Sequence, residues 1–359
     1  MTSSPAALDG AFWQDRRVFL TGHTGFIGGW TAAVLCRLGA KVSGFALAPP
    51  TDPSFFQLTN LSERINGTIG DVRDRDALAA AIAAAAPDLV IHLAAQPLVR
   101  IGFTNPVETF ATNVLGTVNL LDCVRSGPRA VLVMTSDKVY RETHSENRED
   151  YRLGAHHPYG ASKVCCEVVA EAYAHSFLAP AGISVATVRA GNVVGGGDWA
   201  LDRLIPDVVR ALSSGQPLSL RQPDAERPWQ HVLDAVYGML LVGQALSHAG
   251  EATAWNVGPP SGRNMTVRQV VSLAASAWGY EGKVVSEGPP TYEEAAILTL
   301  SSERIRQQLG YAEPWDLAEI IARTISWYRS ALAGKDAWQL AQADIDAYFG
   351  NRLVAVRLQ

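Results

Sequence analysis

A tyrosine and a lysine four residues apart, Tyr159 and Lys163, are the side chains in this sequence best suited to taking a proton from an alcohol. On a helix this spacing places them on one face, one turn apart. A neighbouring ammonium group stabilises a phenolate, and a phenolate can take a hydroxyl proton while a hydride leaves the same carbon. The pair therefore predicts alcohol oxidation; the alternative is a purely structural pair.

Three further polar residues, Ser136, Asp137 and Lys138, follow an apolar run that is predicted to be the fifth strand of a sheet. Open α/β sheets present their reactive groups at the carboxyl ends of their strands. A serine at this place can orient a substrate hydroxyl, and the adjacent carboxyl and amine indicate a second proton-transfer step. The alternative for Asp137 and Lys138 is a solvated pair in a loop.

Three evenly spaced glycines lie between a predicted strand and a predicted helix. There, bare backbone amides and the N-terminus of the helix can receive a pyrophosphate, whose approach a Cβ atom would block. The pattern predicts a dinucleotide site in the first strand-helix-strand unit; the alternative is a tight turn without a ligand. The residues of the predicted site are Gly22, Thr24, Gly25, Phe26, Ile27 and Gly28.

The adenosine end of this site lacks the usual acidic residue. Such sites place Asp or Glu on the ribose about 20 residues after the glycines, but the second predicted strand ends in Gly44-Phe45-Ala46-Leu47-Ala48. No Lys or Arg lies between Val42 and Asp52 to bind a 2′-phosphate, so NAD is favoured over NADP. Asp71, with Val72 beside it, is a candidate for the adenine; equally, it could be an acidic residue at the start of a helix.

Strands and helices alternate over the first half of the chain, which places these residues at strand ends and helix starts. Continuous apolar strands such as Leu-Val-Ile-His-Leu are typical of a parallel sheet that is buried on both faces and has right-handed helical crossovers. We therefore predict an α/β fold with a Rossmann-like, doubly wound parallel sheet. The predicted strands are residues 16–21, 41–45, 68–71, 89–94, 130–135 and 184–188, and the predicted helices are residues 27–38, 74–84, 113–125 and 159–177.

Beyond residue 192 the alternation becomes irregular, and glycines and prolines punctuate shorter elements. This pattern predicts a smaller, mixed α/β substrate-binding lobe over residues 193–330, after an NAD-binding domain over residues 1–192. A C-terminal helical extension is predicted over residues 331–359. Segments near 230–258 and 315–335 are expected to pack back on the first domain. Later helices are predicted at residues 234–245, 267–278, 303–309 and 317–330.

Composition excludes several classes of protein. Of 359 residues, 48% are hydrophobic and 18% are charged, which excludes a fibrous or disordered chain. A net charge of −5 argues against a nucleic-acid partner. The longest uncharged run, residues 18–36, is too rich in glycine and threonine for a membrane helix, and we expect no membrane partner. Four cysteines lack metal-ligand or disulfide spacing, so we expect no metal and a reduced, cytoplasmic protein.

Six motifs occur in one order between about residues 17 and 328. Together they resemble the extended short-chain dehydrogenases/reductases that act on nucleotide sugars, and most closely the CDP-D-glucose 4,6-dehydratases. The glycine turn and Tyr-x-x-x-Lys are shared across the superfamily. Ser-Asp-Lys followed by the last two motifs is typical of the CDP-glucose enzymes, where the dTDP-glucose dehydratases have Asp-Glu. The motifs are Gly22-His23-Thr24-Gly25-Phe26-Ile27-Gly28, Thr135-Ser136-Asp137-Lys138, Tyr159-Gly160-Ala161-Ser162-Lys163, Arg189-Ala190-Gly191-Asn192, Gly195-Gly196-Gly197-Asp198-Trp199 and Arg227-Pro228-Trp229-Gln230-His231-Val232.

The resemblance implies a lyase that holds NAD and converts CDP-D-glucose to CDP-4-keto-6-deoxy-D-glucose for deoxysugar biosynthesis, as in lipopolysaccharide O-antigen. Tyr159, helped by Lys163 and Ser136, would deprotonate the glucose 4-hydroxyl as the C4 hydride passes to the nicotinamide. The ketone acidifies the C5 hydrogen, water leaves from C6 with Asp137 as the acid, and the hydride returns to C6. Lys138 occupies the position of the usual C5 base, a role that requires a neutral amine.

The resemblance also assigns binding residues. For three of them another role is open: Arg203 could cap a helix, Arg227 could lie in a surface loop, and His231 could have a packing role alone. The residues that would hold the substrate are Gln96, Asn192, Arg203, Arg227 and His231, and the small residues that would line the cofactor bed are Leu93, Ala94 and Ala95.

Related enzymes commonly pair through helices of the first domain, here residues 113–125 and 159–177, so a homodimer or a dimer of dimers is expected. Two other functions stay open. One is another nucleotide-sugar 4,6-dehydratase or an epimerase, which shares the glycine turn and the Tyr-Lys pair. The other, from a different class, is a non-catalytic NAD-binding regulator, although such a protein would be expected to have lost Tyr159 or Lys163.

Overall fold

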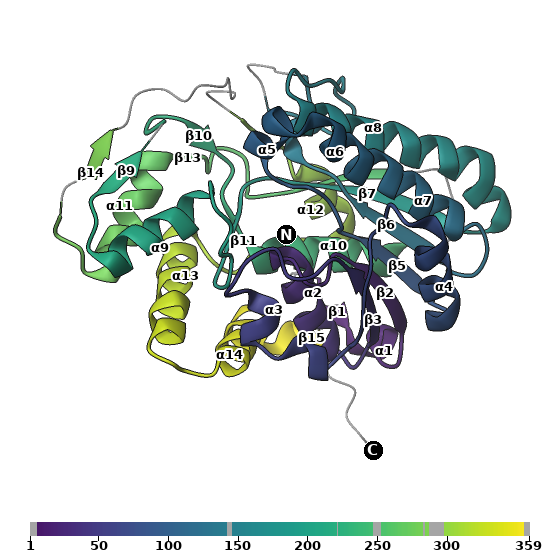
Figure 1. Cartoon of the computed structure of the whole chain (residues 1–359), viewed down its shortest axis with the longest axis horizontal. Coiled ribbons are helices and arrows are strands. Elements are labelled where there is room, and N and C mark those ends of the chain that lie inside the picture. Colours follow the sequence, from purple (N-terminus) through teal and green to yellow (C-terminus); the bar gives the residue numbers. More distant parts are fainter. Residues whose placement is uncertain are drawn as a thin grey trace.

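A seven-stranded sheet lies at the centre of the computed structural model, which describes residues 6–141, 146–220, 222–246, 253–282, 284–286 and 298–354. Every neighbouring pair of its strands is parallel (Figure 1). The strand order is β4-β3-β2-β5-β6-β7-β12, which confirms the predicted doubly wound sheet. The strands are β2 (Arg17–Thr21), β3 (Lys41–Ala46), β4 (Asn66–Ile69), β5 (Leu89–His92), β6 (Ala130–Met134), β7 (Ser184–Ala190) and β12 (Thr253–Val257).

Both faces of the sheet are buried beneath helices. Successive side chains along a strand point to opposite sides, so each strand contributes to two cores. In β2, Val18 and Leu20 enter one hydrophobic core and Phe19 enters the other. In β6, Leu132 and Val133 divide in the same way. The first core is covered by α2 (Phe26–Arg37) and α10 (Val232–Ala245), and the second by α4 (Arg75–Ala85), α7 (Gly116–Cys123) and α8 (Pro158–Tyr173).

The strand order reverses between β2 and β5, and at such a point the loops that leave neighbouring strands diverge and form a crevice. Hydrogen bonds of Thr21 join the two strand ends there. Its hydroxyl oxygen accepts from the amides of Leu93 and Ala94, both at 3.2 Å, and lies 2.7 Å from Nδ1 of His92. The sheet therefore fixes the spacing between the glycine turn and residues 93–95.

Shorter elements complete the crossovers, and two predicted helices are interrupted. The helix predicted over residues 113–125 begins as a π turn and ends at Cys123, and the helix predicted over 159–177 ends at Tyr173 before a second π turn. The short elements are α3 (Phe55–Leu58), η1 (Leu61–Glu63), α5 (Val99–Thr104), α6 (Pro106–Phe110), η2 (Ala111–Leu115), η3 (Asp137–Val139), η4 (Ala174–Leu178) and η5 (Ala179–Ala181).

A smaller group of elements lies beside the large sheet in Figure 1. Three helices, α9 (Leu204–Ser214), α11 (Val267–Trp278) and α13 (Leu317–Leu332), pack together there. Three two-stranded pairs accompany them. The pairs are β8 (Val193–Val194) with β11 (Gln230–His231), β9 (Leu218–Leu220) with β14 (Val284–Ser286), and β10 (Glu226–Arg227) with β13 (Met265–Thr266).

The end of the chain returns to its beginning. After α12 (Glu303–Leu309) and α13, helix α14 (Ala337–Phe349) packs on α2 and α3, and the Tyr348 hydroxyl donates to Oδ1 of Asp234 on α10, 2.7 Å away. The η6 turn (Gly350–Arg352) leads to β15 (Leu353–Val354), which pairs with β1 (Leu8–Asp9), and β1 precedes α1 (Gly10–Trp13). Of the extension predicted over residues 331–359, the last five lie outside the described residues. In the described part of the chain, no helix has the length and apolar character needed to cross a membrane.

Candidate active site

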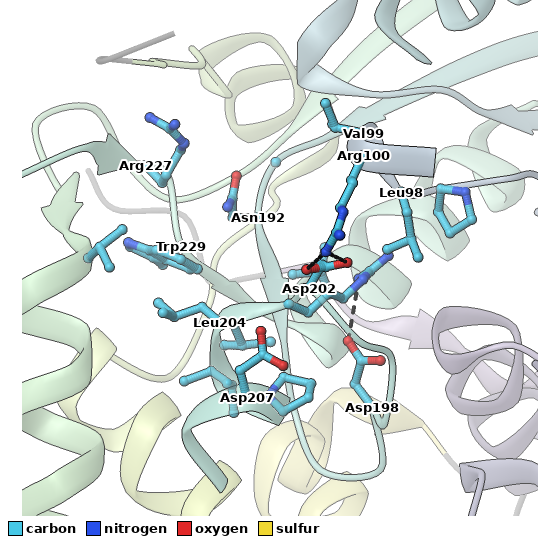
Figure 2. Close-up of a pocket in the computed structure, with 18 of the residues that line it drawn as sticks. Leu98, Val99, Arg100, Asn192, Asp198, Asp202, Leu204, Asp207, Arg227 and Trp229 are labelled. Atoms are coloured by element: carbon cyan, nitrogen blue, oxygen red, sulfur yellow. Dashed lines mark hydrogen bonds and ion pairs between the residues drawn. The ribbon is translucent and has the colours of Figure 1, made fainter. Parts of the chain in front are cut away.

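A pocket of about 730 Å³ opens at the carboxyl ends of β5, β6 and β7, between the sheet and the smaller group of elements (Figure 2). This volume is typical of small-molecule sites. One wall comes from the sheet and from α8, and the other comes from α9, β9 and β10. The predicted residues that line it are Ile27, Leu93, Ala95, Ser136, Asp137, Lys138, Tyr159, Lys163, Asn192, Arg203 and Arg227.

Helix α8 presents Tyr159 and Lys163 to this pocket from its first two turns. The helix begins there because Pro158 occupies its first position and the Nδ1 atom of His157 accepts from the Gly160 amide, 3.0 Å away. The ring of His157 also lies parallel to that of Tyr159, with 6.2 Å between centroids. Nζ of Lys163 donates to the carbonyl oxygen of Met134 at 3.0 Å, which ties α8 to the end of β6. The phenol and the amine thus reach the pocket from one helix face.

The turn after β6 brings Ser136, Asp137 and Lys138 together. Oγ of Ser136 accepts from the Lys138 amide at 3.2 Å and donates to Oδ1 of Asp137 at 3.0 Å. Nζ of Lys138 lies 3.2 Å from the same carboxylate oxygen. Asp137 is 1% exposed, and its Oδ2 atom has no hydrogen-bond partner among the residues that the structure describes. The alternative of a solvated loop pair is therefore wrong for Asp137.

The glycine turn fits the diphosphate of a dinucleotide. Gly22 has a φ of +78°, and a Cβ atom there would lie 2.7 Å from the Ala94 amide nitrogen; a Cβ on Gly28 would lie 2.0 Å from the Gly22 carbonyl oxygen. Gly25 differs, because a Cβ would approach only that carbonyl oxygen, at 3.4 Å. Gly25 is the N-cap of α2, and no described side chain caps this helix. The amides of its first turn are thus available to an anion.

The other predicted cofactor residues divide into two groups. Ile27, Leu93 and Ala95 line the pocket, with Phe26 packed against the neighbouring core and Ala94 directly beneath Gly22. Thr24 instead donates from Oγ1 to the Leu47 carbonyl oxygen at 2.9 Å, which ties the glycine turn to the end of β3.

The predicted adenine residues lie apart from the lining of this pocket. Arg73 forms an ion pair of 2.6 Å with Asp71 and, through this hydrogen-bonded contact, lowers the pKa of the Asp71 carboxyl. The N-cap of α4 is Asp74, so Asp71 is not the acidic residue of a helix start. Val72 is buried in the core beneath α4 and α7.

Three of the predicted substrate residues lie on the pocket wall, and Figure 2 labels two of them, Asn192 and Arg227. Oδ1 of Asn192 is buried without a hydrogen-bond partner among the described residues. Arg227 is 6% exposed and donates from Nη1 to the Glu226 carbonyl oxygen at 2.8 Å, so the alternative of a surface loop is wrong. Arg203 occupies the N-cap position of α9, but its side chain makes no cap and pairs with Asp198 at 3.4 Å.

The other two predicted substrate residues have structural contacts instead. His231 is fully buried, its Nδ1 atom accepts from the Leu233 amide at the start of α10, and its ring packs edge-on to that of Trp315. The side chain of Gln96 joins α6 to the loop before α5: Nε2 donates to the Thr109 hydroxyl on α6 at 2.9 Å, and Oε1 accepts from the Leu98 amide at 2.6 Å. We therefore correct both assignments from substrate contact to support of the backbone.

The structure adds one charged pair that sequence reasoning missed. Arg100 on α5 donates to Asp202, 2.9 Å away, and the pair spans the pocket between the sheet side and the loop before α9 (Figure 2). Arg100 follows the fourth predicted strand closely, so its position near the carboxyl edge of the sheet was a usable signal. Its partner lies 102 residues away and had no signal in the sequence.

Comparison with known proteins agrees with this geometry. Residues 18–258 match the model of the NAD dependent epimerase/dehydratase family, a span that includes the glycine turn, the Tyr-Lys pair and most of the pocket. The chain belongs to this family. Its members in the comparisons include both dehydratases and epimerases.

Two curated dehydratases of the family resemble the chain in sequence. It is 41% identical to the CDP-glucose 4,6-dehydratase of Salmonella typhimurium over 352 residues, which cover 95% of this chain and 98% of that protein. It is 31% identical to a dTDP-glucose 4,6-dehydratase of Streptomyces antibioticus over 72% of this chain and 75% of that one. A dTDP-glucose 4,6-dehydratase of Streptomyces venezuelae, solved as a double mutant with NAD bound, superposes with a TM-score of 0.77 and 25% identity over 89% of this chain and 99% of that chain.

Proposed function

We propose that this protein is an NAD-dependent hydro-lyase that converts CDP-D-glucose to CDP-4-keto-6-deoxy-D-glucose. The observation that carries the proposal is the presence of two proton-transfer pairs on one pocket, Tyr159 with Lys163 and Asp137 with Lys138. An epimerase needs a coenzyme that exchanges hydride with C4 and one acid–base group at the 4-hydroxyl. A dehydratase also needs an acid and a base for the loss of water, and the second pair supplies both.

The Tyr159–Lys163 pair acts first. When bound, NAD would supply the acceptor for the C4 hydride and its return to C6. The glycine turn would hold its diphosphate, and Ile27, Leu93 and Ala95, which line the pocket, would lie beside it. Tyr159, as the phenolate stabilised by the Lys163 ammonium, takes the proton of the 4-hydroxyl. Ser136 orients that hydroxyl.

The Asp137–Lys138 pair then removes water. Its 3.2 Å contact lets one proton move between an ammonium–carboxylate form and an amine–carboxylic acid form. In the latter form Lys138 takes the C5 proton, and Asp137 protonates the C6 hydroxyl, which leaves as water. When the hydride returns to C6, the Lys138 ammonium gives a proton to C5. Asp137 regains from solvent a proton equal to the one that Tyr159 releases, so protons balance over the cycle.

The substrate is held from the opposite wall. Asn192 offers its buried amide oxygen to a sugar hydroxyl, and Arg203 and Arg227 offer guanidinium groups to the diphosphate. On this proposal residues 193–330 form the nucleotide-sugar-binding lobe beside an NAD-binding domain over residues 1–192.

We propose further that the protein is a cytoplasmic homodimer. Helices α7 and α8 and their π turns expose large apolar side chains on the outside of the sheet, among them Leu115, Val168 and Phe177, and a second copy would cover them. The product would enter deoxysugar biosynthesis, for example of lipopolysaccharide O-antigen.

A substrate panel tests the function. Purified protein is incubated with NAD and CDP-, dTDP-, GDP- or UDP-glucose, without an added reductant, and products are identified by mass and by NMR, which distinguishes an epimer from unreacted substrate. We expect loss of one water from CDP-glucose and from no other sugar. Loss of water from a different sugar would reassign the nucleotide, a product of unchanged mass would indicate an epimerase, and the absence of any product would refute catalysis.

A further inference from the structure

Behind the turn that carries Asp137 and Lys138 lies a buried ion pair that none of the proposed chemical steps uses. Arg189 on β7 contacts Glu167 on α8 at two points: Nε donates to Oε1 at 3.0 Å, and Nη2 donates to Oε2 at 2.8 Å. The two side chains are only 4% and 5% exposed. Apolar residues of similar volume often stabilise a fold as well as such a pair does, or better. Fold stability alone is therefore a weak reason for this ion pair.

This pair is bonded to both ends of the turn. At the start, the Thr135 hydroxyl donates to Oε1 of Glu167. At the end, Nη1 of Arg189 donates to the Tyr140 hydroxyl at 2.8 Å. A two-point contact between a guanidinium and a carboxylate fixes the orientation of both groups. The separation of the two ends of the turn is therefore set by one rigid pair.

Further hydrogen bonds join the pair and the turn to the sheet. The Thr187 hydroxyl on β7 donates to Oε2 of Glu167 at 2.8 Å. The Tyr140 hydroxyl donates to Oδ1 of Asn256 on β12 at 2.6 Å, and burial raises the pKa of Tyr140 to about 12, so this hydroxyl keeps its proton. The turn is thereby held by α8, β7 and β12 together.

The oxidation pair has a different support. Tyr159 and Lys163 are placed by the backbone of α8, and Lys163 is held in addition by the Met134 carbonyl oxygen. In the described part of the chain, no hydrogen bond of Glu167 or Arg189 reaches Tyr159 or Lys163. A change in this ion pair should therefore move the turn without moving the oxidation pair.

We propose that Glu167 and Arg189, acting through Thr135 and Tyr140, are positioning residues chiefly for the elimination of water, whose acid and base both lie on this turn, whereas the oxidation at C4 takes only Ser136 from it. They hold the Asp137 carboxyl and the Lys138 amine in place at C6 and C5 of the sugar. This inference rests on the proposed dehydratase function. It adds that the buried ion pair supports the elimination residues, whereas α8 and the Met134 carbonyl oxygen support the oxidation pair.

The test separates the two chemical steps in the full-length protein. Thr135→Val removes a hydroxyl at nearly constant volume, and Tyr140→Phe removes the other anchor. In both we expect coenzyme reduction on mixing with CDP-glucose to slow much less than elimination, because Ser136 alone of the oxidation residues lies on the turn. Solvent deuterium entry at C5 and loss of water should slow by about 10- to 100-fold, the cost of a misplacement on the order of 1 Å. Reduced coenzyme should accumulate, and kcat should fall at unchanged KM.

Matched variants distinguish positioning from general damage. Thr135→Ser keeps the hydroxyl and should restore elimination. Thr324→Val and Tyr237→Phe remove buried hydroxyls that bond backbone carbonyls far from the turn, and both should leave every step unchanged. Arg189→Lys keeps the charge but loses the planar fork, so it should slow elimination more than oxidation. Thermal unfolding is recorded for each variant.

Two results would overturn the inference while leaving the proposed function intact. One is wild-type elimination in Thr135→Val, Tyr140→Phe and Arg189→Lys. The other is an equal slowing of oxidation and elimination in variants that melt at the wild-type temperature. Failure of the proposed function has a different signature, because the wild-type protein itself would then release no water from any of the four sugars, and the inference would fall with it.

Discussion

At the scale of single residues, the site contains two proton-transfer pairs with different surroundings. Tyr159 and Lys163 are both largely buried at the start of α8. Asp137 is buried as well, whereas the Lys138 side chain keeps 23% exposure. An amine with access to water can exchange its protons with solvent between removing a C5 proton and returning one. The C5 position is therefore the place where an isotope from solvent should appear.

Replacement of the phenol tests the first pair. Tyr159→Phe should lower turnover of CDP-glucose by about 10²- to 10⁴-fold, the usual contribution of a positioned acid–base group. Affinity for NAD and the melting temperature should change little, because the ring is retained. Tyr173→Phe, at the other end of α8, is the matched control and should be fully active. Normal turnover in Tyr159→Phe, measured by product mass, would remove the basis of the mechanism.

The second pair is tested by two single substitutions. Lys138→Ala should still reduce the coenzyme but should lose solvent deuterium entry at C5 by about 10²-fold or more, because the base is gone. Asp137→Asn should slow both that exchange and the loss of water, since the carboxyl that takes the Lys138 proton and then protonates the C6 hydroxyl is gone. Deuterium at C5 is followed by mass and NMR, with the exposed Lys41→Ala as control. A normal rate of deuterium entry in Lys138→Ala would refute the role of Lys138 as the base.

At the scale of elements, the glycine turn and α2 together form the predicted anion site, and the three glycines are needed there for different reasons. Gly22 and Gly28 are required by close backbone contacts within the turn and with β5. Gly25 has no such contact, but it stands at the uncapped N-terminus of α2. A side chain at Gly25 would therefore destabilise the fold little but would hinder the approach of an anion to the amides of α2.

This difference predicts opposite phenotypes for two conservative substitutions. Gly25→Ala should melt near the wild-type temperature and bind NAD about tenfold more weakly, a loss of about 1.4 kcal/mol. Gly28→Ala should lower the melting temperature markedly, because its Cβ would overlap the Gly22 carbonyl oxygen. Calorimetric titration with NAD and thermal unfolding measure both effects. Unchanged NAD affinity in Gly25→Ala would show that no phosphate approaches this amide.

At the scale of the whole molecule, contacts between segments far apart in the chain hold the elements together. Arg100 and Asp202 join the sheet side to the α9 side, and Tyr348 on α14 bonds Asp234 on α10. The interior also contains three imidazoles, His23, His92 and His231, that are nearly or fully buried. Burial lowers the pKa of His23 to about 4 and those of His92 and His231 to about 3.

These imidazoles predict a loss of stability in mild acid. Their folded-state pKa values lie below the ordinary value of 6.5, so the unfolded chain binds protons first as pH falls. The contribution of these three groups to the free energy of unfolding should be greatest above about pH 6.5 and fall as pH drops toward 4, by about 2 kcal/mol per group at about pH 5. Urea unfolding across this range measures the slope.

One variant isolates the contribution of a single imidazole. His92→Asn should flatten the dependence of the unfolding free energy on pH, because it removes a group that the fold keeps neutral. His175→Asn should leave the slope as in the wild type, since His175 is exposed. Equal slopes in wild type and His92→Asn would contradict the prediction.

Much of the fold and of the site could be predicted from local pattern. The order of the first six sheet strands with helices α2, α4, α7 and α8, the glycine turn, and the placement of Tyr159 and Lys163 on one helix face follow from periodicities of two to four residues. Ser136, Asp137 and Lys138 were predictable because a polar cluster directly follows an apolar strand. The seventh strand, β12, was not predicted, since one short run after an irregular lobe has no periodic signal.

The amino-acid sequence by itself determined the family, the sheet and the chemical groups, because each depends on residues that are close together in the chain. Only the tertiary structure decided which of those groups meet. It turned His231 and Gln96 into supports of the backbone, paired Arg100 with Asp202, and placed the Glu167–Arg189 contact behind the Ser136–Lys138 turn. These contacts join residues on separate elements or loops, and their geometry follows from how whole elements pack, which no local pattern encodes.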